Sequence, residues 1–440
     1  MGTKAYRDRI FHLKNRAKKL LPESALNAYY SLYPLVGRIA YGNPSGSLKV
    51  IGVTGTDGKS STVLCAARML EEAGCKTGFF SSIAFSDGAG EKSNTMKMTM
   101  PGKLFMQQFL RQLKKNGCEY AVLEVTSEGV KQKRHLFIDF DVAVVTNIKP
   151  EHIESHGGFD RYKKAKSEIF KGIIRGKRKG VPKTIVVNTD DPEARSFLSF
   201  KAERKITYGK EPHKGGIQGE IVESTLYKNI IRINEGASSW EVLLPIGGPF
   251  APENALAAIA IGRSLGIPME ICIRALEKIA GIPGRFEIVS RKPFVIVDYG
   301  HTVAALEKLL PFVRRKWHGK IIHVFGAAGG GRDSWKRPRF GELSEQFCDI
   351  SIITEENPFD EPRGAIAHDI IRGFKKTDNV EVILHRTDAV KKALELATEE
   401  TLILCTGKGS ETVIAAPLGK KIPYNEKETV LWLLGAASQE

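Results

Sequence analysis

The stretch that most constrains this chain is Lys49–Thr62, with the sequence KVIGVTGTDGKSST. The apolar run at residues 50–53 predicts a short buried strand, and residues 61–72 predict a helix. The glycines between them permit a turn whose backbone N–H groups point inward, which is the geometry that cradles phosphate oxygens. The following helix adds its positive N-terminal end to the same anion. The stretch therefore predicts a nucleotide-binding loop at the edge of an α/β sheet.

Two side chains of this loop suit phosphate chemistry. Lys59 would place its ammonium against the β- and γ-phosphates, and Ser60 would place its hydroxyl on a bound Mg²⁺. The strict P-loop pattern would put its first glycine at Val53, whereas the glycines here are at 52, 55 and 58. The form GTDGKS is therefore a variant, and the alternative is a plain strand–turn–helix connection that carries a lysine.

The remaining pattern predicts two α/β units. At 440 residues the chain is too long for one core. Alternating strands and helices predict a mostly parallel P-loop sheet, and a second Rossmann-like α/β series follows a hinge at Pro283. We expect a helical N-terminal extension and linker at 1–47, a central ATP-binding domain at 48–282 and a C-terminal domain at 283–440. The strands are predicted at 49–53, 77–81, 119–125, 141–146 and 184–188, in a β-rich patch at 204–245, and at 294–298, 320–325, 349–353, 380–384 and 401–405.

Charge and cysteine usage limit the possible partners. The net charge is +16, but no nucleic-acid-binding signature accompanies it, so no nucleic-acid partner is expected. The six cysteines form no C-x-x-C pair, which favours reduced thiols and a cytoplasmic location. No apolar run approaches the roughly 20 residues of a membrane span, and the first residues lack a signal-peptide core.

Residues 1–47 carry eight lysines and arginines against two acidic residues. Their apolar spacing predicts two helical segments, the second at Ala25–Tyr41, followed by a linker at 42–46. A helical hairpin packed on the next domain is the favoured interpretation. A basic amphipathic segment resting on a membrane surface is the alternative.

Further candidate residues follow the predicted strands. Glu124 ends one of them, so its carboxylate would reach the carboxyl edge of the sheet and could hold the Mg²⁺ that Ser60 also touches. His152 follows another strand, although a lone histidine there is more often structural than a ligand. Lys166 lies on the helix after it.

Ten runs in order resemble the Mur ligase family, and most closely its MurE type, over residues 48–430. Beside GTDGKS, they are EVTSEGVKQKR (124–134), TNIKPEHIESHG (146–157), AK (165–166), NTDD (188–191), NALAA (254–258), GRFE (284–287), DYGHT (298–302), FGAAGGGRDSWKRP (325–338), ENP (356–358) and GKG (407–409). The resemblance implies an ATP-dependent, ADP-forming ligase that adds an amino acid to a cell-wall peptide precursor through an acyl phosphate. It implies two Mg²⁺ sites and small-molecule substrates, namely a nucleotide- or lipid-linked precursor and an amino acid. We expect a monomer.

The resemblance also assigns roles by position. The catalytic residues would be Lys59, Glu124, His152 and Lys166. The ATP site would contain Gly55, Thr56, Gly58, Lys59, Ser60, Ser61, Asn254 for the adenine, Arg285 for the γ-phosphate and Asp298 for the ribose. The first Mg²⁺ would take Ser60 and Glu124, and the second would take His152 and Lys166 as a carbamate. The substrates would contact Thr99, Ser127, Gln132, Arg134, His301, Glu356, Asn357, Gly407 and Glu411.

Several positions depart from the family pattern. The 47 residues before the first strand are too few for the usual UDP-binding domain. Phe359 stands where diaminopimelate-selective enzymes have an arginine, so we expect lysine or another amino acid without a distal carboxylate. Ser410 and Glu128 each replace a family histidine, and Pro150-Glu151 replaces Arg-Asp. A folylpolyglutamate-synthetase-like ligase and an ATP-binding module without ligase activity remain as alternatives.

Overall fold

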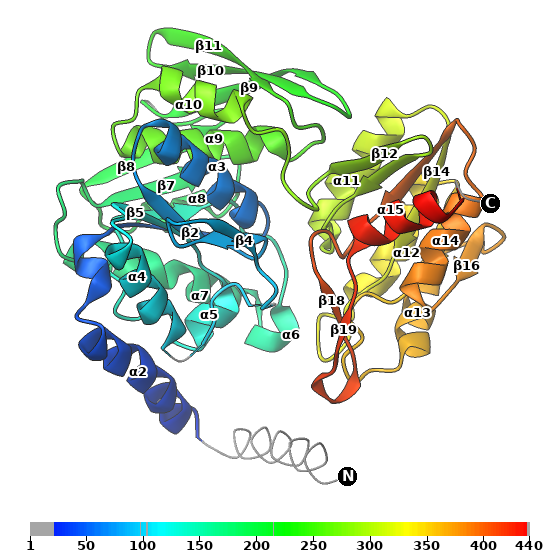
Figure 1. Ribbon diagram of the computed structural model, residues 1–440, viewed down its shortest axis with the longest axis horizontal. Coiled ribbons are helices and arrows are strands. Elements are labelled where there is room, and N and C mark those ends of the chain that lie inside the picture. Colours follow the sequence, from blue (N-terminus) through cyan, green and yellow to red (C-terminus); the bar gives the residue numbers. More distant parts are fainter. Residues whose placement is uncertain (1–21, 97, 103, 214, 438–440) are drawn as a thin grey trace.

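The computed structural model describes residues 22–96, 98–102, 104–213 and 215–437, which form two α/β units side by side (Figure 1). The first unit is built on an eleven-stranded sheet in the order β11-β10-β9-β8-β7-β6-β1-β5-β2-β3-β4. From β9 through β8, β7, β6, β1 and β5 to β2, each strand pairs in parallel with the next. Antiparallel strands extend the two edges, β10 and β11 beside β9, and β3 and β4 beside β2. The strands are β1 (Lys49–Thr54), β2 (Thr77–Phe80), β3 (Ala84–Ser86), β4 (Glu91–Ser93), β5 (Tyr120–Glu124), β6 (Val142–Val145), β7 (Thr184–Asn188), β8 (Arg204–Gly209), β9 (Ile217–Ser224), β10 (Asn229–Glu235) and β11 (Ser238–Leu244).

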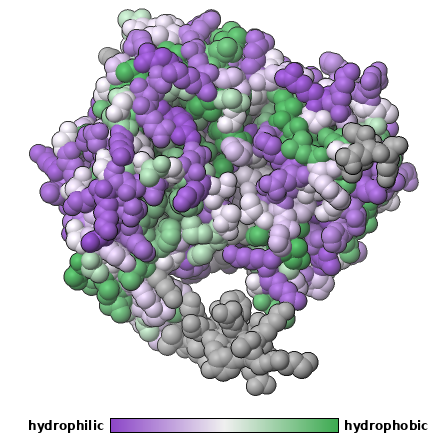
Figure 2. All heavy atoms as spheres, viewed as in Figure 1, coloured by the Kyte–Doolittle hydropathy of each residue, from purple (hydrophilic) through white to green (hydrophobic). Residues whose placement is uncertain are grey.

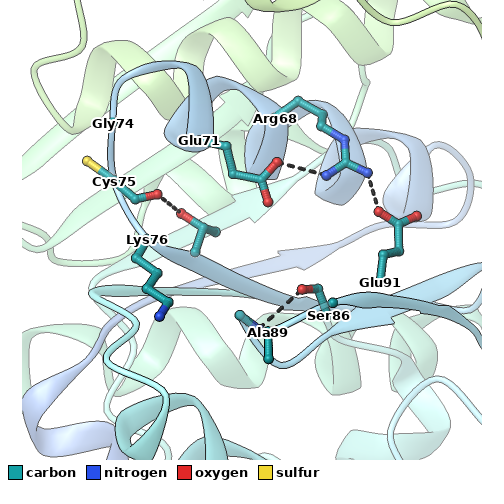
Figure 3. Close-up of a pocket in the computed structure, with 11 residues that line it drawn as sticks. Arg68, Glu71, Gly74, Cys75, Lys76, Ser86, Ala89 and Glu91 are labelled. Carbon is teal, nitrogen blue, oxygen red and sulfur yellow. Dashed lines mark hydrogen bonds and ion pairs between the residues drawn. The ribbon is translucent and has the colours of Figure 1, made fainter.

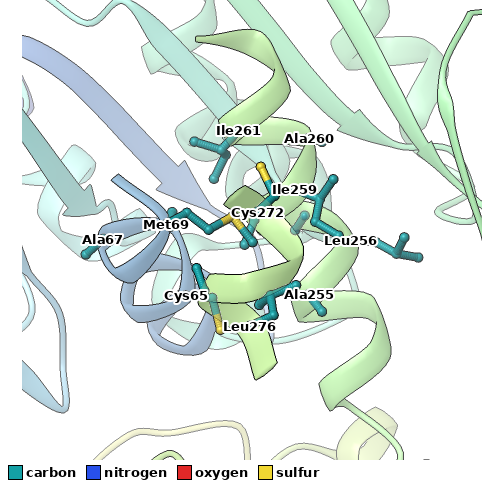
Figure 4. Close-up of a cluster of buried hydrophobic side chains, with 14 of the residues drawn as sticks. Cys65, Ala67, Met69, Ala255, Leu256, Ile259, Ala260, Ile261, Cys272 and Leu276 are labelled. Carbon is teal, nitrogen blue, oxygen red and sulfur yellow. The ribbon is translucent and has the colours of Figure 1, made fainter. Parts of the chain in front are cut away.

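Helices cover both faces of this sheet because its central strands are apolar on both sides. One face packs on α3 (Lys59–Glu72), α9 (Ala251–Ser264) and α10 (Met269–Glu277), whose buried side chains meet in one cluster (Figure 4). The other face packs on α4 (Phe105–Lys115), α5 (Ser127–Lys131), α7 (Phe159–Lys171), η2 (Ile173–Arg175) and α8 (Ala194–Leu198). The short α6 (Ile153–His156) precedes α7.

The second unit is built on a six-stranded sheet in the order β12-β13-β17-β14-β15-β16, parallel except at β12. Its strands are β12 (Glu287–Arg291), β13 (Phe294–Val297), β14 (Lys320–Phe325), β15 (Ile350–Ile353), β16 (Val380–Val382) and β17 (Thr401–Cys405). Helices α11 (Val303–Lys316), α12 (Lys336–Phe347) and α13 (Arg363–Ile371) cover one face, and α14 (Arg386–Glu395) and α15 (Glu426–Ala437) cover the other. A small hairpin of β18 (Val413–Ala415) and β19 (Lys421–Pro423) surrounds η3 (Pro417–Gly419).

The predicted fold class is confirmed, and every predicted strand is present within a residue or two of its expected bounds. No strand was predicted at β3, β4, β12 or the β18–β19 hairpin. Four of the missed strands have only three residues each, which is too short for an alternating pattern to stand out. No helix within the described ranges is long and apolar enough to cross a membrane.

The N-terminal region is partly as predicted. The second helical segment is α2 (Glu23–Ala40), which packs on α4, whereas the first segment falls at residues 1–21, outside the described residues. The predicted linker at 42–46 lies between α2 and β1 and packs against the first unit. Pro44, Ser45 and Gly46 are buried in η1 (Pro44–Ser47), and Ser45 accepts a hydrogen bond from the Asp139 amide.

Part of the basic run at residues 171–183 is structural. The ammonium groups of Lys179 and Lys183 are buried and pair with the two carboxylate oxygens of Asp141 at 2.5 and 2.8 Å. Lys179 also donates to the carbonyls of Leu48 and Asp139. These lysines therefore fasten the segment before β7 to the start of β1, so they do not contribute to a solvated basic surface.

Candidate active site between the two units

A cavity of about 430 Å³ lies where the carboxyl ends of the strands of both sheets face each other. This is the edge at which open α/β sheets bind ligands. Among the predicted site residues, those that line the cavity are Thr56, Gly58, Lys59, Ser60, Ser61, Thr99, Glu124, Ser127, Gln132, Arg134, His152, Asn254, Arg285, Asp298, His301 and Glu411. The structure thus brings together residues that are far apart in the sequence.

The other predicted residues lie directly behind this lining. Lys166 Nζ donates a hydrogen bond to the carbonyl of Gly55, below the loop. Asn357 Nδ2 donates to Glu411 at 2.9 Å. A Cβ added at Gly407 would lie 3.1 Å from the Glu356 carboxylate, so these two residues are neighbours. Lys166 therefore contacts the phosphate loop and Asn357 contacts Glu411, whereas Glu356 and Gly407 contact each other outside the lining.

The loop after β1 has the conformation that its glycines permit. Gly55 has φ +146° and Gly58 has φ +82°. A Cβ at Gly55 would lie 1.9 Å from Thr146 Oγ1, and one at Gly58 would lie 2.4 Å from Asn254 Oδ1. Both positions therefore need glycine for backbone conformation and for space.

Residues after β6 hold this loop in place. Thr146 Oγ1 donates to the Asp57 carbonyl at 2.6 Å, and the Asp57 amide donates to Asn147 Oδ1 at 2.9 Å. Lys59 begins α3, and its ammonium donates to the Thr56 carbonyl at 2.6 Å. The ammonium is therefore held at the mouth of a loop built to receive phosphate.

The end of β5 places a carboxylate beside the loop. Glu124 pairs in register with Val53 of β1, and its Oε2 accepts a hydrogen bond from Ser60 Oγ at 2.7 Å. The Ser82 amide donates to the same oxygen at 2.8 Å. A hydroxyl and a carboxylate oxygen at this separation are hard donors suited to Mg²⁺.

His152 lines the same cavity and Lys166 lies behind the loop, and burial lowers the pKa of both side chains. Burial, with the cations of Arg332 and Lys166 nearby, lowers the pKa of His152 to about 2. Burial and the charge of Lys59 hold the pKa of Lys166 well below its usual range. The His152 backbone is left-handed at φ +56°. No group of three or more His, Cys, Asp or Glu side chains with metal-site geometry occurs in the described part of the chain, so a cation here would need other ligands.

Polar side chains form a chain at one end of the cavity. Gln132 Nε2 donates to Glu128 at 2.7 Å, and the Arg134 guanidinium donates to Gln132 Oε1 and to the Met100 carbonyl. Ser127 starts α5 after its N-cap, Thr126. These groups leave this end of the cavity suited to a polar, anionic substrate.

The loops of the second unit close the opposite side. Both carboxylate oxygens of Asp298 accept hydrogen bonds from backbone N–H groups, one from Phe286 at 2.7 Å and the other from Gly300 at 2.6 Å. The Arg285 guanidinium lies 4.1 Å from the centre of the Tyr299 ring. Burial, with Lys336 nearby, lowers the pKa of His301 to about 3. Asp298 therefore shapes the hinge as well as facing the cavity.

The end of the cavity near Glu411 contains a buried polar group. Lys408 Nζ lies 2.6 Å from Glu411 Oε2 and 3.1 Å from Asn357 Oδ1. Phe359 lies beside it with φ +54°, and the Arg332 guanidinium lies 5.9 Å from the centre of its ring. The carboxylate of Glu411 is thus fixed by a buried cation.

Contacts across the two units include residues that the sequence reasoning did not single out. Lys336 Nζ lies 2.8 Å from Glu151. Asp333 accepts hydrogen bonds from the Ile153 and Glu154 amides at 3.2 and 3.0 Å. Asp333 and Lys336 lie within the run FGAAGGGRDSWKRP (325–338). That motif is the feature of the sequence that could have pointed to them. Asp57 is also in the cavity, and Thr302 Oγ1 lies 3.4 Å from its carboxylate.

A second hollow, of about 440 Å³, lies outside this site and beside α3 (Figure 3). The Arg68 guanidinium pairs there with both Glu71 and Glu91. None of the predicted site residues lines it. Arg68, Glu71 and Glu91 already satisfy one another there, and no residue assigned to the reaction lines it, so we assign this hollow no role in the reaction.

Comparison with known proteins gives two family matches. Residues 53–262 match the family model of the Mur ligase middle domain, and residues 284–409 match that of the Mur ligase, glutamate ligase domain. A UDP-N-acetylmuramyl-tripeptide synthetase of Roseiflexus sp. is 36% identical over 88% of this chain and 78% of its own length. A UDP-N-acetylmuramoyl-L-alanyl-D-glutamate–2,6-diaminopimelate ligase of Clostridium acetobutylicum is 34% identical over 90% and 80%.

Solved structures agree on the architecture. The structure of a UDP-N-acetylmuramoyl-L-alanyl-D-glutamate–2,6-diaminopimelate ligase superposes with a TM-score of 0.60 at 25% identity, covering 89% of this chain and 79% of that one. A folylpolyglutamate synthase of Mycobacterium tuberculosis superposes with a TM-score of 0.70 at 17% identity, covering 88% and 96%. The second likeness shows the shared fold alone.

Proposed function

Because the chain belongs to the Mur ligase family, we propose that the cavity between its two units is where it joins an amino acid to a cell-wall peptide precursor with the use of ATP. The chain is an ATP-dependent, ADP-forming amide ligase of this family. The observation that carries the location is the grouping of Lys59, Ser60 and Glu124 at one loop, facing Arg285 from the other unit.

ATP would lie with its phosphates on the loop at residues 55–61, where Lys59 neutralises charge on the transferred phosphoryl group. Asn254 lies against Gly58, at the wall where the nucleotide would lie. Arg285 approaches from the hinge. Because positioning and charge stabilisation are the main contributions of a protein to phosphoryl transfer, these contacts are the catalytic apparatus. The domain division 48–282 and 283–440 then puts one part of the ATP site in each domain.

Mg²⁺, on which the family depends, would lie at Ser60 and Glu124, and when bound it supplies positive charge to the phosphates. We assign a second cation site to His152 and Lys166. An ammonium cannot bind a cation, but a neutral lysine amine adds CO₂ and releases a proton to give a carbamate with two oxygen donors. The low pKa of Lys166 and the uncharged His152 ring support this assignment.

The acyl substrate would lie along Thr99, Ser127, Gln132 and Arg134, where the Arg134 guanidinium suits a carboxylate or phosphate. Its carboxylate would attack the γ-phosphate to form an acyl phosphate and ADP. The amine of the incoming amino acid, received near Glu411, would then displace phosphate. The contacts between the units keep water from the acyl phosphate. A nucleotide-linked precursor fits the names of the relatives, and a lipid-linked one remains the alternative.

Measuring phosphate release tests this function. Purified enzyme is given ATP and Mg²⁺ with UDP-linked muramoyl dipeptide, with a lipid-linked equivalent or with folate, each with and without amino acids. Release that requires both a muramoyl peptide and an amino acid supports the proposal. Release with folate and glutamate alone would favour the folylpolyglutamate alternative, and release with no substrate pair would favour a module without ligase activity.

We also propose that the enzyme acts as a monomer in the cytoplasm. Its six cysteines are free thiols, which fits a reducing compartment. Light scattering coupled to size-exclusion chromatography, with and without substrates, tests the oligomeric state.

A further inference from the structure

The outward face of α2 is apolar over about three helical turns. Tyr29, Leu32, Leu35, Val36 and Ile39 have exposed fractions of 42%, 56%, 39%, 44% and 73%. Their spacing of three, four and seven residues puts them on one side of a helix with 3.6 residues per turn. Figure 2 shows hydrophobic spheres gathered at the lower left, where Figure 1 places α2. A face of this length and hydrophobicity on a helix marks an interaction surface.

The other side of α2 already makes its contacts with the protein. Pro34 is buried, and a Cβ at Gly37 would lie 3.0 Å from Gln107 and 3.3 Å from Leu104 of the region around α4. Arg111 of α4 lies over the ring of Tyr41 at 5.9 Å. The helix is therefore seated through its small and polar side, and its most apolar side is left outward.

Charge identifies the occupant of this face. Residues 1–21, directly before α2, carry seven lysines and arginines and a single aspartate. An apolar helix face that directly follows a basic stretch of sequence suits an anionic lipid surface. A second copy of the chain fits less well, because both copies would bring the same positive charge to the interface.

The position of α2 relates this face to the cavity. Met98, Thr99 and Met100 line the acyl-substrate end of the cavity, and Leu104, four residues after Met100, contacts α2 at Gly37. A surface that binds α2 would therefore lie at the end where the acyl substrate enters. Docking there would bring the cavity close to precursors at a membrane.

We propose that the apolar face of α2 docks the enzyme on an anionic membrane surface, lying in the interface and crossing no bilayer. This surface is separate from the residues assigned to the reaction. The proposal stands on the geometry of α2, so a failure of the ligase assignment would leave it intact.

Vesicle co-sedimentation of the full chain tests the proposal. The probes are vesicles of phosphatidylcholine alone and of phosphatidylcholine with phosphatidylglycerol, each at low and high salt. We expect binding to the anionic vesicles, little binding to the neutral ones and weaker binding in high salt. The triple variant Leu32→Glu, Val36→Glu, Ile39→Glu should lose roughly tenfold or more of this binding, because it places carboxylates on the apolar face.

A matched control carries Ile221→Glu and Leu243→Glu, which are exposed at 50% and 44% on the hairpin strands β9 and β11. It should bind anionic vesicles as the parent does, and both variants should keep the parent's ATP turnover. Equal vesicle binding by the parent and the triple variant would overturn the proposal. So would a parent that binds no vesicles, whether it self-associates through this face, as shown by light scattering, or stays a monomer with the face covered by its own residues 1–21.

Discussion

Lys336 Nζ lies 2.8 Å from Glu151 Oε1, and this buried ion pair joins the second unit to the first at the edge of the cavity. Lys336 also donates to the His301 carbonyl at 3.1 Å. Burial raises the pKa of Glu151, and the charge of Lys336 opposes that rise. The ion pair can form only while the two units are in contact. It therefore stabilises the closed arrangement in which the cavity residues of both units face each other.

The first prediction concerns this pair. Lys336→Met would leave the Glu151 carboxylate buried without its cation, which typically costs about 3–5 kcal/mol. We expect the closed arrangement to lose most of its population and ligase turnover to fall by on the order of 100-fold. Small-angle X-ray scattering should show a larger radius of gyration. The double variant Lys336→Met, Glu151→Gln removes the stranded charge and should regain part of the compactness, and a double variant as open as the single one would contradict this reading.

The second prediction concerns the loop lysine. Lys59→Ala removes the ammonium held at the mouth of the phosphate loop, so ATP turnover should fall by at least roughly 100-fold. Circular dichroism and the denaturation midpoint should stay close to those of the parent. Lys76→Ala, in the separate hollow of Figure 3, is the matched control and should keep full turnover. A Lys59→Ala enzyme that releases phosphate at the parent rate would show that the loop has been misassigned.

The sequence was most informative where chemistry follows a strand end. Ser60 and Glu124 were predicted to share a cation, and they lie 2.7 Å apart because β1 and β5 are neighbours. The role of Asp333 could not be predicted, since its partners are backbone amides of α6 in the other unit. A motif shows which residues matter, but contacts between units depend on how the two sheets face each other.

The sequence predicted the positions of strands better than it predicted which charged side chains are buried. Lys179 and Lys183 belong to a stretch rich in lysine and arginine at 171–183, yet both are buried against Asp141. Burial of a lysine depends on a distant carboxylate, here some 40 residues away in the chain, and local composition carries no sign of it.

The third prediction is that Lys166 is carbamylated in the active enzyme. Its depressed pKa gives a larger neutral fraction of the amine at a given pH than an exposed lysine would have, which favours addition of CO₂. Enzyme supplied with ¹³C-bicarbonate should show a carbamate carbon signal in NMR that is absent from Lys166→Ala. That variant should be inactive and partly rescued by formate or acetate. Lys164→Ala, at an exposed position on the same helix, should keep both signal and activity, and an unlabelled parent would disprove the modification.

The fourth prediction concerns acid stability and His135. Burial lowers the pKa of His135 to about 4, below the roughly 6.5 of an unfolded histidine. Between these values the unfolded chain binds a proton that the folded chain does not, so stability falls as pH falls through this window. In His135→Asn the slope of unfolding free energy against pH should decrease by roughly 1 kcal/mol per pH unit between pH 6 and 5. Urea unfolding at several pH values measures it, and parallel slopes for the two proteins would contradict the assigned pKa.

The last prediction concerns the incoming amino acid. Phe359 stands where an arginine would bind a distal carboxylate, and two other cations that could replace it are already engaged. Arg363 pairs with Glu355 at 3.3 Å, and Lys408 is buried against Glu411 at 2.6 Å. Loss of a desolvated bidentate pair costs about 2–5 kcal/mol, which is enough to reverse a preference. The enzyme should therefore prefer lysine or ornithine to meso-diaminopimelate.

A competition assay with the three amino acids at equal concentration measures this preference. Arg332 lines the cavity beside Phe359, so it is the cation that could still receive a distal carboxylate. If diaminopimelate is preferred by the parent and Arg332→Gln removes the preference, the interpretation of Phe359 is wrong and Arg332 is the selective residue. If lysine is preferred, Phe359→Arg should shift the ratio toward diaminopimelate by roughly tenfold or more, because it restores a charge-assisted partner at the same position.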